Sequence, residues 1–335
     1  MTIAMYKKIL IPIDNSRYSR YCTDLGISLA SRFGSELTGN HVYTAKLHDK
    51  RFRDMEGGLP GHYKEEERLR KSRKVHDSLI GDGLKLISDA YLETFKKNCM
   101  TSSIPFSCKM LEGKNWLELV KDVRSSGYDL VILGILGLGA VNGNLIGSVC
   151  ERVVRKVTAD ILVVKNDEPL KDRLVVAIDG SDHSLSAFKK ALELSKRFHL
   201  KLEAVSVYDP YFHRRAFQAL VGVLSEEAGH MFKFKDQEKL HDEIIDDGLG
   251  KIYKGYLDQA VQLGADNGVE VKKTLLAGKA YDEIEKYLEK DPPSILMVGR
   301  FGAHKTDEQD IGNTAENLLR LAPCNILISG VPQTA

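Results

Sequence analysis

The segment from Asp129 to Lys165 reads DLVILGILGLGAVNGNLIGSVCERVVRKVTADILVVK, and it decides the fold class of the chain. The apolar run at 130–133 leads into a glycine-rich segment without charged residues, and an amphipathic segment begins at Gly147 and Ser148. This order predicts a strand, a loop and a helix. The β-branched run at 161–164 is then expected to be the next strand of a parallel sheet.

The glycines of this segment indicate a phosphate-binding loop. Glycine at the end of a strand lets the backbone approach a ligand closely, and the unpaired N–H groups at the start of the next helix favour an anion. The spacing is Gly134, two residues, Gly137, nine residues, and then Gly147 with the hydroxyl of Ser148. It matches neither a Walker loop nor GxGxxG. A tight turn whose glycines serve only packing is the alternative interpretation.

The length and composition set the limits of the search. The 335 residues suffice for two domains of ordinary size. Lys plus Arg is 48 and Asp plus Glu is 47, so the charge gives no reason to expect nucleic acid or a membrane as partner. Without a recognisable signal peptide or a long apolar stretch, a soluble cytoplasmic protein is expected. The five scattered cysteines predict reduced thiols.

The second half of the chain repeats the first at a constant offset of 165 residues. The matched positions include Asp14 with Asp179, Ser16 with Ser181, His76-Asp77 with His241-Asp242, and Gly134, Gly137 and Gly147 with Gly299, Gly302 and Gly312. Chance glycine turns would not share one register, which favours the binding loop over the packing turn. The repeat predicts two domains, at residues 1–166 and 172–332.

Each repeat alternates strands and helices, which predicts two tandem α/β domains, each a doubly wound, Rossmann-like sheet of five parallel strands. In such sheets the ligand lies beyond the carboxyl ends of the strands, where the strand order reverses. Asp14 follows the first strand and Gly134 ends the fourth, so both should face one crevice. The polar segment 44–63 is expected to be an exposed, mobile excursion, and 64–97 a long helix.

The loop spacing is similar to the nucleotide-binding signature of the universal stress protein family, and the glycines and Ser148 fill all its positions. The resemblance covers nearly the whole chain as two tandem copies, and it implies an adenine nucleotide alpha hydrolase-like fold. Its implied ATP contacts in the first copy are Pro12, Asp14, Val42, Gly134, Gly137, Gly147, Ser148 and the N–H of Val149. The corresponding positions in the second copy are Asp179, Val207, Gly299, Gly302, Gly312 and Asn313.

The resemblance also implies roles and an assembly. The acidic residue after the first strand would contact the base and ribose, the end of the second strand the adenine, and the glycine loop the phosphates. The family usually dimerises along its last strand. This implies an internal pseudo-dimer that pairs 161–164 with 326–329, and a further homodimer stays open.

The two loops differ in charge. The second has Asn313 in place of Ser148, and it carries Asp307, Glu308 and Asp310. Each close pair of like charges costs about 1 kcal/mol near a surface, so the first site is expected to be the better one for ATP. Some family members have a basic residue where this chain has Leu136. Phosphate binding would then rest on backbone donors, with Mg²⁺ as a companion ion.

Other motifs give weaker signals. The repeated His76-Asp77 segment is interpreted as a helix–helix contact, with Gly83 permitting close approach, rather than as a metal site. Spacing shows no Ser/His/Asp or Cys/His arrangement, so an enzyme would at most hydrolyse ATP slowly. The prediction is an ATP-binding, nucleotide-dependent regulator of the stress response with a possible protein partner. An interaction scaffold that uses an inter-domain surface and a weak ATPase stay open as alternatives.

Overall fold

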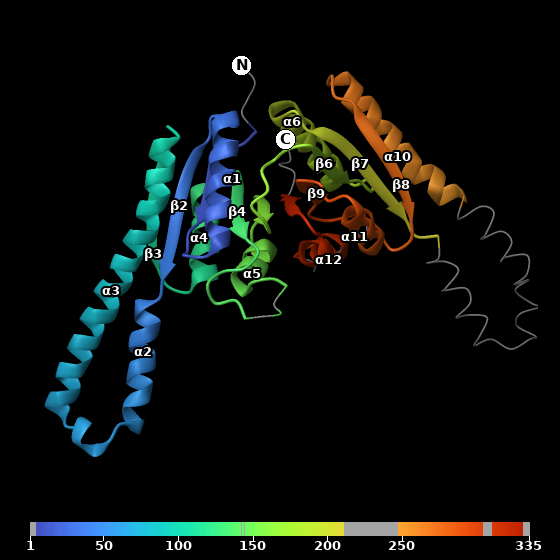
Figure 1. Cartoon of the computed structure of the whole chain (residues 1–335). Helices are drawn as coiled ribbons and strands as arrows, with labels where there is room; N and C mark the ends of the chain where they lie inside the picture. The colour runs from blue at the N-terminus through green and yellow to red at the C-terminus, as the bar shows by residue number, and fades with distance from the viewer. Residues whose placement is uncertain (1–4, 142, 144, 211–246, 304–309, 331–335) are drawn as a thin grey trace, which may run out of the picture. The chain divides into compact units, whose positions relative to one another are not determined.

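The computed structural model describes residues 5–141, 143, 145–210, 247–303 and 310–330. The chain divides into two compact units, residues 1–167 and 168–335. In the described residues each unit has five parallel strands with helices packed against them (Figure 1). The predicted fold class, two tandem α/β domains with parallel sheets, is confirmed.

The elements of the first unit alternate as predicted. They are β1 (Lys8–Pro12), α1 (Arg17–Phe33), β2 (Glu36–Tyr43), α2 (Ala45–Met55), α3 (Glu66–Thr101), β3 (Phe106–Glu112), α4 (Asn115–Ser126), β4 (Leu130–Gly134), α5 (Ser148–Lys156) and β5 (Asp160–Val164). Helix α1 begins where the Oγ of Ser16 accepts a hydrogen bond from the N–H of Ser19, and it ends at Gly34 in the left-handed conformation.

The second unit follows the same order. Its described elements are β6 (Arg173–Ala177), α6 (Asp182–Phe198), β7 (Lys201–Tyr208), α10 (Asp247–Asp266), β8 (Val271–Ala277), α11 (Ala280–Lys290), β9 (Ile295–Gly299), α12 (Asn313–Leu321) and β10 (Asn325–Ser329). Ser181 caps α6 as Ser16 caps α1, since its Oγ accepts from the N–H of Ser184. The repeat in the sequence is therefore also a repeat of local structure.

The strand order places the site. Within the first unit it is β3-β2-β1-β4-β5, and within the second it is β8-β7-β6-β9-β10. The first strand of each unit lies between its second and fourth strands, so the order reverses beside it. The central strands are fully buried, as Leu10 and Ile132 are both 0 % exposed. Their carboxyl ends form the edge where ligands of doubly wound sheets bind.

The segment 44–63 has regular structure that was not predicted from the sequence. It is largely helical, with α2 followed by two 3₁₀ turns at Glu56–Gly58 and Gly61–Tyr63. Helix α2 runs beside α3 beyond the end of β2 (Figure 1). The Phe52 ring stacks on His76 of α3 with a centroid distance of 4.2 Å. Most of the segment is exposed, as predicted, and its helical structure, which was not predicted, packs against a helix later in the chain.

The structure locates the repeated HisAsp motif only in part. His76 and Asp77 lie on α3, where His76 stacks on Phe52 of α2 and interaction with the Asp49 carboxyl raises the pKa of Asp77. The second copy, His241-Asp242, lies outside the described residues. None of the helices in the described part of the chain combines the length and the apolar character that crossing a membrane requires.

Candidate functional site

The cavity of the first unit lies where the order of its strands reverses. Its volume is about 440 Å³. The eight positions expected from the sequence all line it: Pro12, Asp14, Val42, Gly134, Gly137, Gly147, Ser148 and Val149. They come from the ends of β1, β2 and β4, from the glycine loop and from the start of α5. The structure thus brings the predicted residues together.

Asp14 holds the glycine loop against the end of β1. Its Oδ1 accepts hydrogen bonds from the N–H and the Oγ of Ser16, at 2.9 and 2.5 Å. Its Oδ2 accepts from the N–H of Leu138 at 3.3 Å. A Cβ added to Gly137 would lie 2.9 Å from that oxygen. Gly137 is therefore needed for the close approach of loop and carboxylate.

The other two glycines also lie against neighbours. A Cβ on Gly134 would come within 2.6 Å of the Cβ of Tyr18. At Gly147 it would lie 3.2 Å from the carbonyl oxygen of Ile135, which accepts the N–H of Gly147 at 2.7 Å. These two glycines therefore also serve packing, as the alternative interpretation of a tight packing turn expected. The close packing also brings the loop to the edge of the cavity.

The start of α5 presents backbone donors to the cavity. The capping residue is Gly147, which has no side chain to bond the first turn. The first N–H that the structure pairs within the helix is that of Glu151, which donates to the carbonyl of Gly147 at 3.0 Å. Ser148, Val149 and Cys150, whose N–H groups precede it, are residues of the cavity lining. Together with the helix dipole they favour an anion there.

The Cys150 thiol is a packed group. Its residue is 3 % exposed, and burial raises the pKa of the thiol to about 12. The dipole at the start of α5 is therefore not used to form a thiolate.

Polar side chains line the same cavity at positions that the sequence analysis did not select. Among them are Asn40, His41 and Asn115. The Nδ1 of His41 lies 2.8 Å from the Oγ of Ser88, and burial lowers the pKa of His41 although the Asp14 carboxylate opposes this. The signal for Asn40 was available, since an amide in an apolar strand is unusual. The direction of the Asn40 side chain, however, could not be predicted from the sequence.

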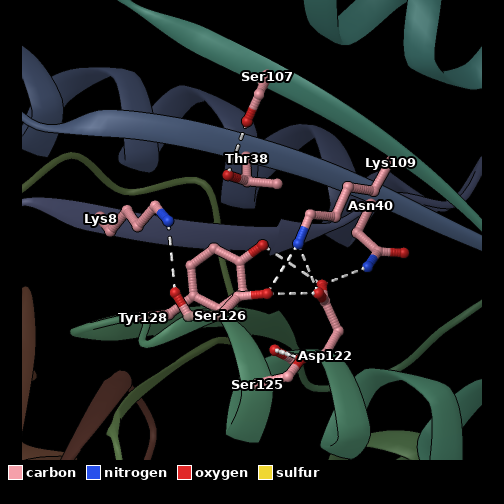
Figure 2. Close-up of polar contacts among 9 residues, drawn as sticks. All are labelled: Lys8, Thr38, Asn40, Ser107, Lys109, Asp122, Ser125, Ser126 and Tyr128. Atoms are coloured by element: carbon pink, nitrogen blue, oxygen red, sulfur yellow. Dashed lines mark hydrogen bonds and ion pairs between the residues drawn. The ribbon is translucent and has the colours of Figure 1, made fainter.

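Asn40 is held by a buried carboxylate of helix α4 (Figure 2). Asp122, 7 % exposed, accepts hydrogen bonds from the Nδ2 of Asn40 at 2.8 Å and from the Nζ of Lys109 at 2.6 Å. Ser126 and Tyr128 donate to the same carboxylate. Within the described residues the Oδ1 of Asn40 is buried without a partner.

The cavity of the second unit is smaller, about 310 Å³. The six positions expected from the sequence all line it: Asp179, Val207, Gly299, Gly302, Gly312 and Asn313. Asp179 repeats the geometry of Asp14, as its Oδ1 accepts from Ser181 and its Oδ2 from the N–H of Ala303 at 3.0 Å. Of the loop carboxylates, Asp307 and Glu308 lie outside the described residues.

Two further residues distinguish the second cavity. Arg300, 2 % exposed, lines it at the position of Ile135, and its Nη1 donates to the carbonyl of Asp310 at 3.4 Å. Tyr253 also lines it, at the position of Ser88. Arg300 was not predicted, because the basic residue was expected directly before the second glycine, where the first loop has Leu136 and the second Phe301, and Arg300 stands one position earlier.

The start of α12 differs from that of α5. Asn313 takes the place of Ser148, and its Oδ1 and its carbonyl oxygen both accept from the Nδ2 of Asn317, at 2.9 and 2.8 Å. The Asn313 side chain is thus engaged by its own helix. Ser148 has no such contact among the described residues, so its hydroxyl can serve the cavity. No group of three or more His, Cys, Asp or Glu in the described part of the chain could hold a metal ion.

Comparison with known proteins identifies the same architecture. The model of the universal stress protein family matches residues 5–165 and 171–330. A universal stress protein of Methanocaldococcus jannaschii is 25% identical over 171 residues, which are 51% of this chain and 89% of that protein. A putative universal stress protein of Staphylococcus epidermidis is 26% identical over 169 residues, 50% of this chain and 89% of that protein.

Solved structures resemble the chain over nearly its full length. A universal stress protein from Archaeoglobus fulgidus superposes with a TM-score of 0.63 at 17% sequence identity, covering 96% of this chain and 98% of that one. A putative universal stress protein from Pseudomonas aeruginosa gives 0.58 at 12% identity, covering 98% and 95%. At these identities the likeness shows the shared fold.

Proposed function

The chain belongs to the universal stress protein family, and we propose that it binds ATP in the cavity of its first unit and acts as a nucleotide-dependent regulator. One observation carries this proposal. The glycine loop, the uncapped start of α5 and the Asp14 carboxylate all border one cavity of about 440 Å³. That volume lies within the range of small-ligand sites.

The residues present fit a nucleotide in outline. The N–H groups of Ser148, Val149 and Cys150 would hold phosphate oxygens, and the Ser148 hydroxyl would add a donor. Asp14 would accept hydrogen bonds from ribose hydroxyls, and the end of β2 at Val42 would lie against the base. None of the described lining residues is Lys or Arg, so Mg²⁺ would supply the countercharge for a triphosphate.

The second cavity is proposed as the weaker ATP site. It is the smaller of the two, and its Asn313 side chain is engaged by Asn317. Arg300 has the opposite effect on affinity at the second cavity, because a cation beside the loop favours phosphate. We therefore assign ATP chiefly to the first cavity.

Regulation would follow from differential affinity. ATP in the first cavity would favour the arrangement of residues 134–148 that best exposes the N–H groups, and with it any partner surface that this loop forms. Binding in a cytoplasmic protein without turnover is the expected behaviour. The Nδ1 of His41 contacts the hydroxyl of Ser88, but that serine is fully buried, does not line the cavity and donates to the carbonyl of Leu84, so it is not placed to act as a nucleophile on a ligand.

The experiment begins with the freshly purified protein. It is denatured, any released nucleotide is identified by mass spectrometry, and the emptied protein is titrated with ATP and Mg²⁺. About one ATP per chain, lost in Gly137→Glu, supports the assignment. An unchanged ATP affinity in Gly137→Glu removes the proposed loop from the site. Steady-state phosphate release that disappears in the same variant would favour the weak ATPase instead.

A further inference from the structure

The long helix α3 has an inner face whose contacts are made within the first unit. Arg73 forms two hydrogen bonds with the Glu56 carboxylate, at 2.6 and 2.5 Å, and His76 stacks on Phe52. Farther along, the helix buries four residues against the sheet and α1: Ser88, Leu92, Phe95 and Cys99. These contacts leave the opposite face of the helix exposed.

The exposed face carries large apolar side chains. Val75 is 59 %, Leu79 69 % and Leu86 70 % exposed, although each is a residue type that burial stabilises. Three such residues along one stripe of a helix are more than the scattered apolar residues of an ordinary surface. A Cβ added to Gly83, beside this stripe, would meet nothing within 4 Å. No contact within the described chain therefore accounts for a glycine at this position.

The stripe continues in both directions with the period of a coiled coil. We call it the α3 seam, and its members are Arg68, Ser72, Val75, Leu79, Asp82, Leu86, Asp89 and Glu93. The spacing between successive members alternates strictly between four and three residues, which keeps one side of a helix facing another helix. Its polar central member, Asp82, accepts a hydrogen bond from the Oγ of Ser78 at 3.1 Å, so its carboxylate is bound by its own helix.

Charge is distributed unequally along the α3 seam. The first end is basic, with Arg68 on the seam and Lys71 beside it, and the other end is acidic, with Asp89 and Glu93. The local ion pairs, Arg68 with Glu65 and Lys96 with Glu93, are exposed and therefore weak. They can be exchanged for other partners at little cost. A parallel pair of such helices would place like charges side by side, whereas an antiparallel pair would join opposite charges.

We propose that the α3 seam binds the α3 seam of a second copy of this chain as an antiparallel two-helix coiled coil. In this register Arg68 lies opposite Glu93 of the second copy, and Val75 lies opposite Leu86. Leu79 packs beside Asp82 and over Gly83, where the missing side chain gives it room. The same contacts recur about a two-fold axis, as a closed dimer requires.

The expected strength of this dimer follows from its size. From Arg68 to Glu93 the seam is about 39 Å long at 1.5 Å per residue. It contributes three large apolar residues from each helix. This is a small interface, and we expect a reversible dimer with a Kd on the order of 10 μM. This surface lies on the helical hairpin, separate from the cavity proposed for ATP.

The first test uses sedimentation equilibrium of the full chain at about 1 to 300 μM, a range that brackets the expected Kd. The Leu79→Glu variant should weaken the dimer at least about tenfold, because it places two carboxylates at the centre of the seam. The matched control is Met55→Glu on α2, an exposed apolar position outside the seam, 64 % exposed. A wild-type chain that stays monomeric overturns the proposal, as does a dimer that Leu79→Glu leaves unchanged.

The second test examines the antiparallel register through its charges. Arg68→Glu and Glu93→Arg should each weaken self-association about tenfold, because each brings like charges together at both ends. When the two variants are mixed, every opposed pair has opposite charges again, so the mixture should associate like the wild type. A mixture no tighter than either variant alone would rule out this register.

A cysteine pair gives an independent readout of orientation. Under mild oxidation, chains with Val75→Cys should form disulfides with chains carrying Leu86→Cys, and neither should couple efficiently to itself. Self-coupling of the Val75→Cys chain would mean that the helices run parallel, contrary to the proposal.

Discussion

The two cavities share a backbone and differ in their polar side chains. In both, an aspartate after the first strand accepts from the glycine loop, and the helix that follows has glycine at its N-cap position, without a side-chain cap. The first cavity has Asn40 and Asn115 where the second repeat has Val205 and Ala280. Repetition has thus preserved the loop, which any phosphate could use, while the side chains that would select the rest of a ligand have diverged.

A second difference concerns buried charge. Among its described residues the first unit has two buried carboxylates, Asp122 and Asp160, and the one that contacts the cavity residue Asn40 is Asp122 of helix α4. In the second unit Glu203 of β7, 1 % exposed, carries a buried carboxylate, and the helix supplies Tyr287 at the position of Asp122. Burial raises the pKa of the Asp122 and Glu203 carboxyls, but donated hydrogen bonds outweigh it and hold both pKa values below their usual range. Both units therefore stabilise a buried, ionised carboxylate with donated hydrogen bonds, but the residues that do so differ.

The largest effect should come from removing a partner of these carboxylates. Arg173, 15 % exposed at its side chain, donates to Glu203 at 2.7 Å, so Arg173→Met leaves a buried charge undercompensated and should destabilise the second unit by about 3 kcal/mol. Lys109→Met should cost the first unit less, because the Lys109 side chain is 36 % exposed and water can replace it.

Urea unfolding measures both free energies of unfolding, with Lys201→Met as an exposed control on β7. Equal losses in the two units would show that the carboxylates are equally dependent on their cations, and the comparison would fail.

The next effect concerns the loops. Gly137→Glu should reduce ATP affinity at the first cavity more than about 100-fold, because the side chain would displace Asp14 and add a second negative charge. Gly302→Glu, whose Cβ would lie 2.7 Å from the Oδ2 of Asp179, should remove only the weaker site. Calorimetric titration gives both stoichiometries.

Alanine variants separate shape from charge. Gly137→Ala meets the Asp14 carboxylate, whereas a Cβ on Gly139 meets nothing within 4 Å, so Gly139→Ala should cost much less affinity. If Gly302→Glu abolished the tighter site, the ranking of the two cavities would be reversed.

A smaller effect on anion affinity is expected when Arg300 is replaced. In a Gly137→Glu background, where the second cavity is the remaining site, Arg300→Met should weaken the binding of inorganic triphosphate about tenfold. Ile135→Met in the same background replaces the equivalent residue of the disabled cavity and serves as the control. Equal affinities in the two variants would show that Arg300 does not act on the anion.

The smallest effect should be a pH dependence confined to the first unit. Burial lowers the pKa of His41, so the unfolded chain takes up the proton first as the pH falls below about 6.5. The stability of the first unit should therefore decline over that range. His41→Ser, which copies Ser206 of the second repeat, should remove this decline, and the exposed His48→Ser should not. A decline that persists in His41→Ser would assign it to another group.

These comparisons show which features of the structure can be predicted from the sequence. The strands, the helices and the glycine loop were predictable because their signals are local: apolar runs, serine caps and glycines at fixed spacing. The constant offset then related every feature of one unit to the other. The side chains that gather around Asn40 were not predictable, because Asp122 and Lys109 reach it from elements far away in the chain.

Two other misses have the same origin. Helix α2 was not predicted, and the stacking of its Phe52 on His76 of α3 is a contact that local sequence does not show. Arg300 was overlooked because its place in the cavity depends on the direction of one side chain at the end of β9. Local sequence patterns predict which secondary structure forms. They say much less about which groups each side chain contacts in the folded unit.

Helix α3 is continuous over 36 residues, but its anchoring is not uniform. All of its buried residues lie from Ser88 onward, while its first half contacts α2, which itself has no buried residue. In native-state hydrogen exchange the helix should therefore divide into two kinetic classes. Amides in its first half should exchange through local opening of the hairpin, and those around Phe95 only when the sheet of the first unit opens.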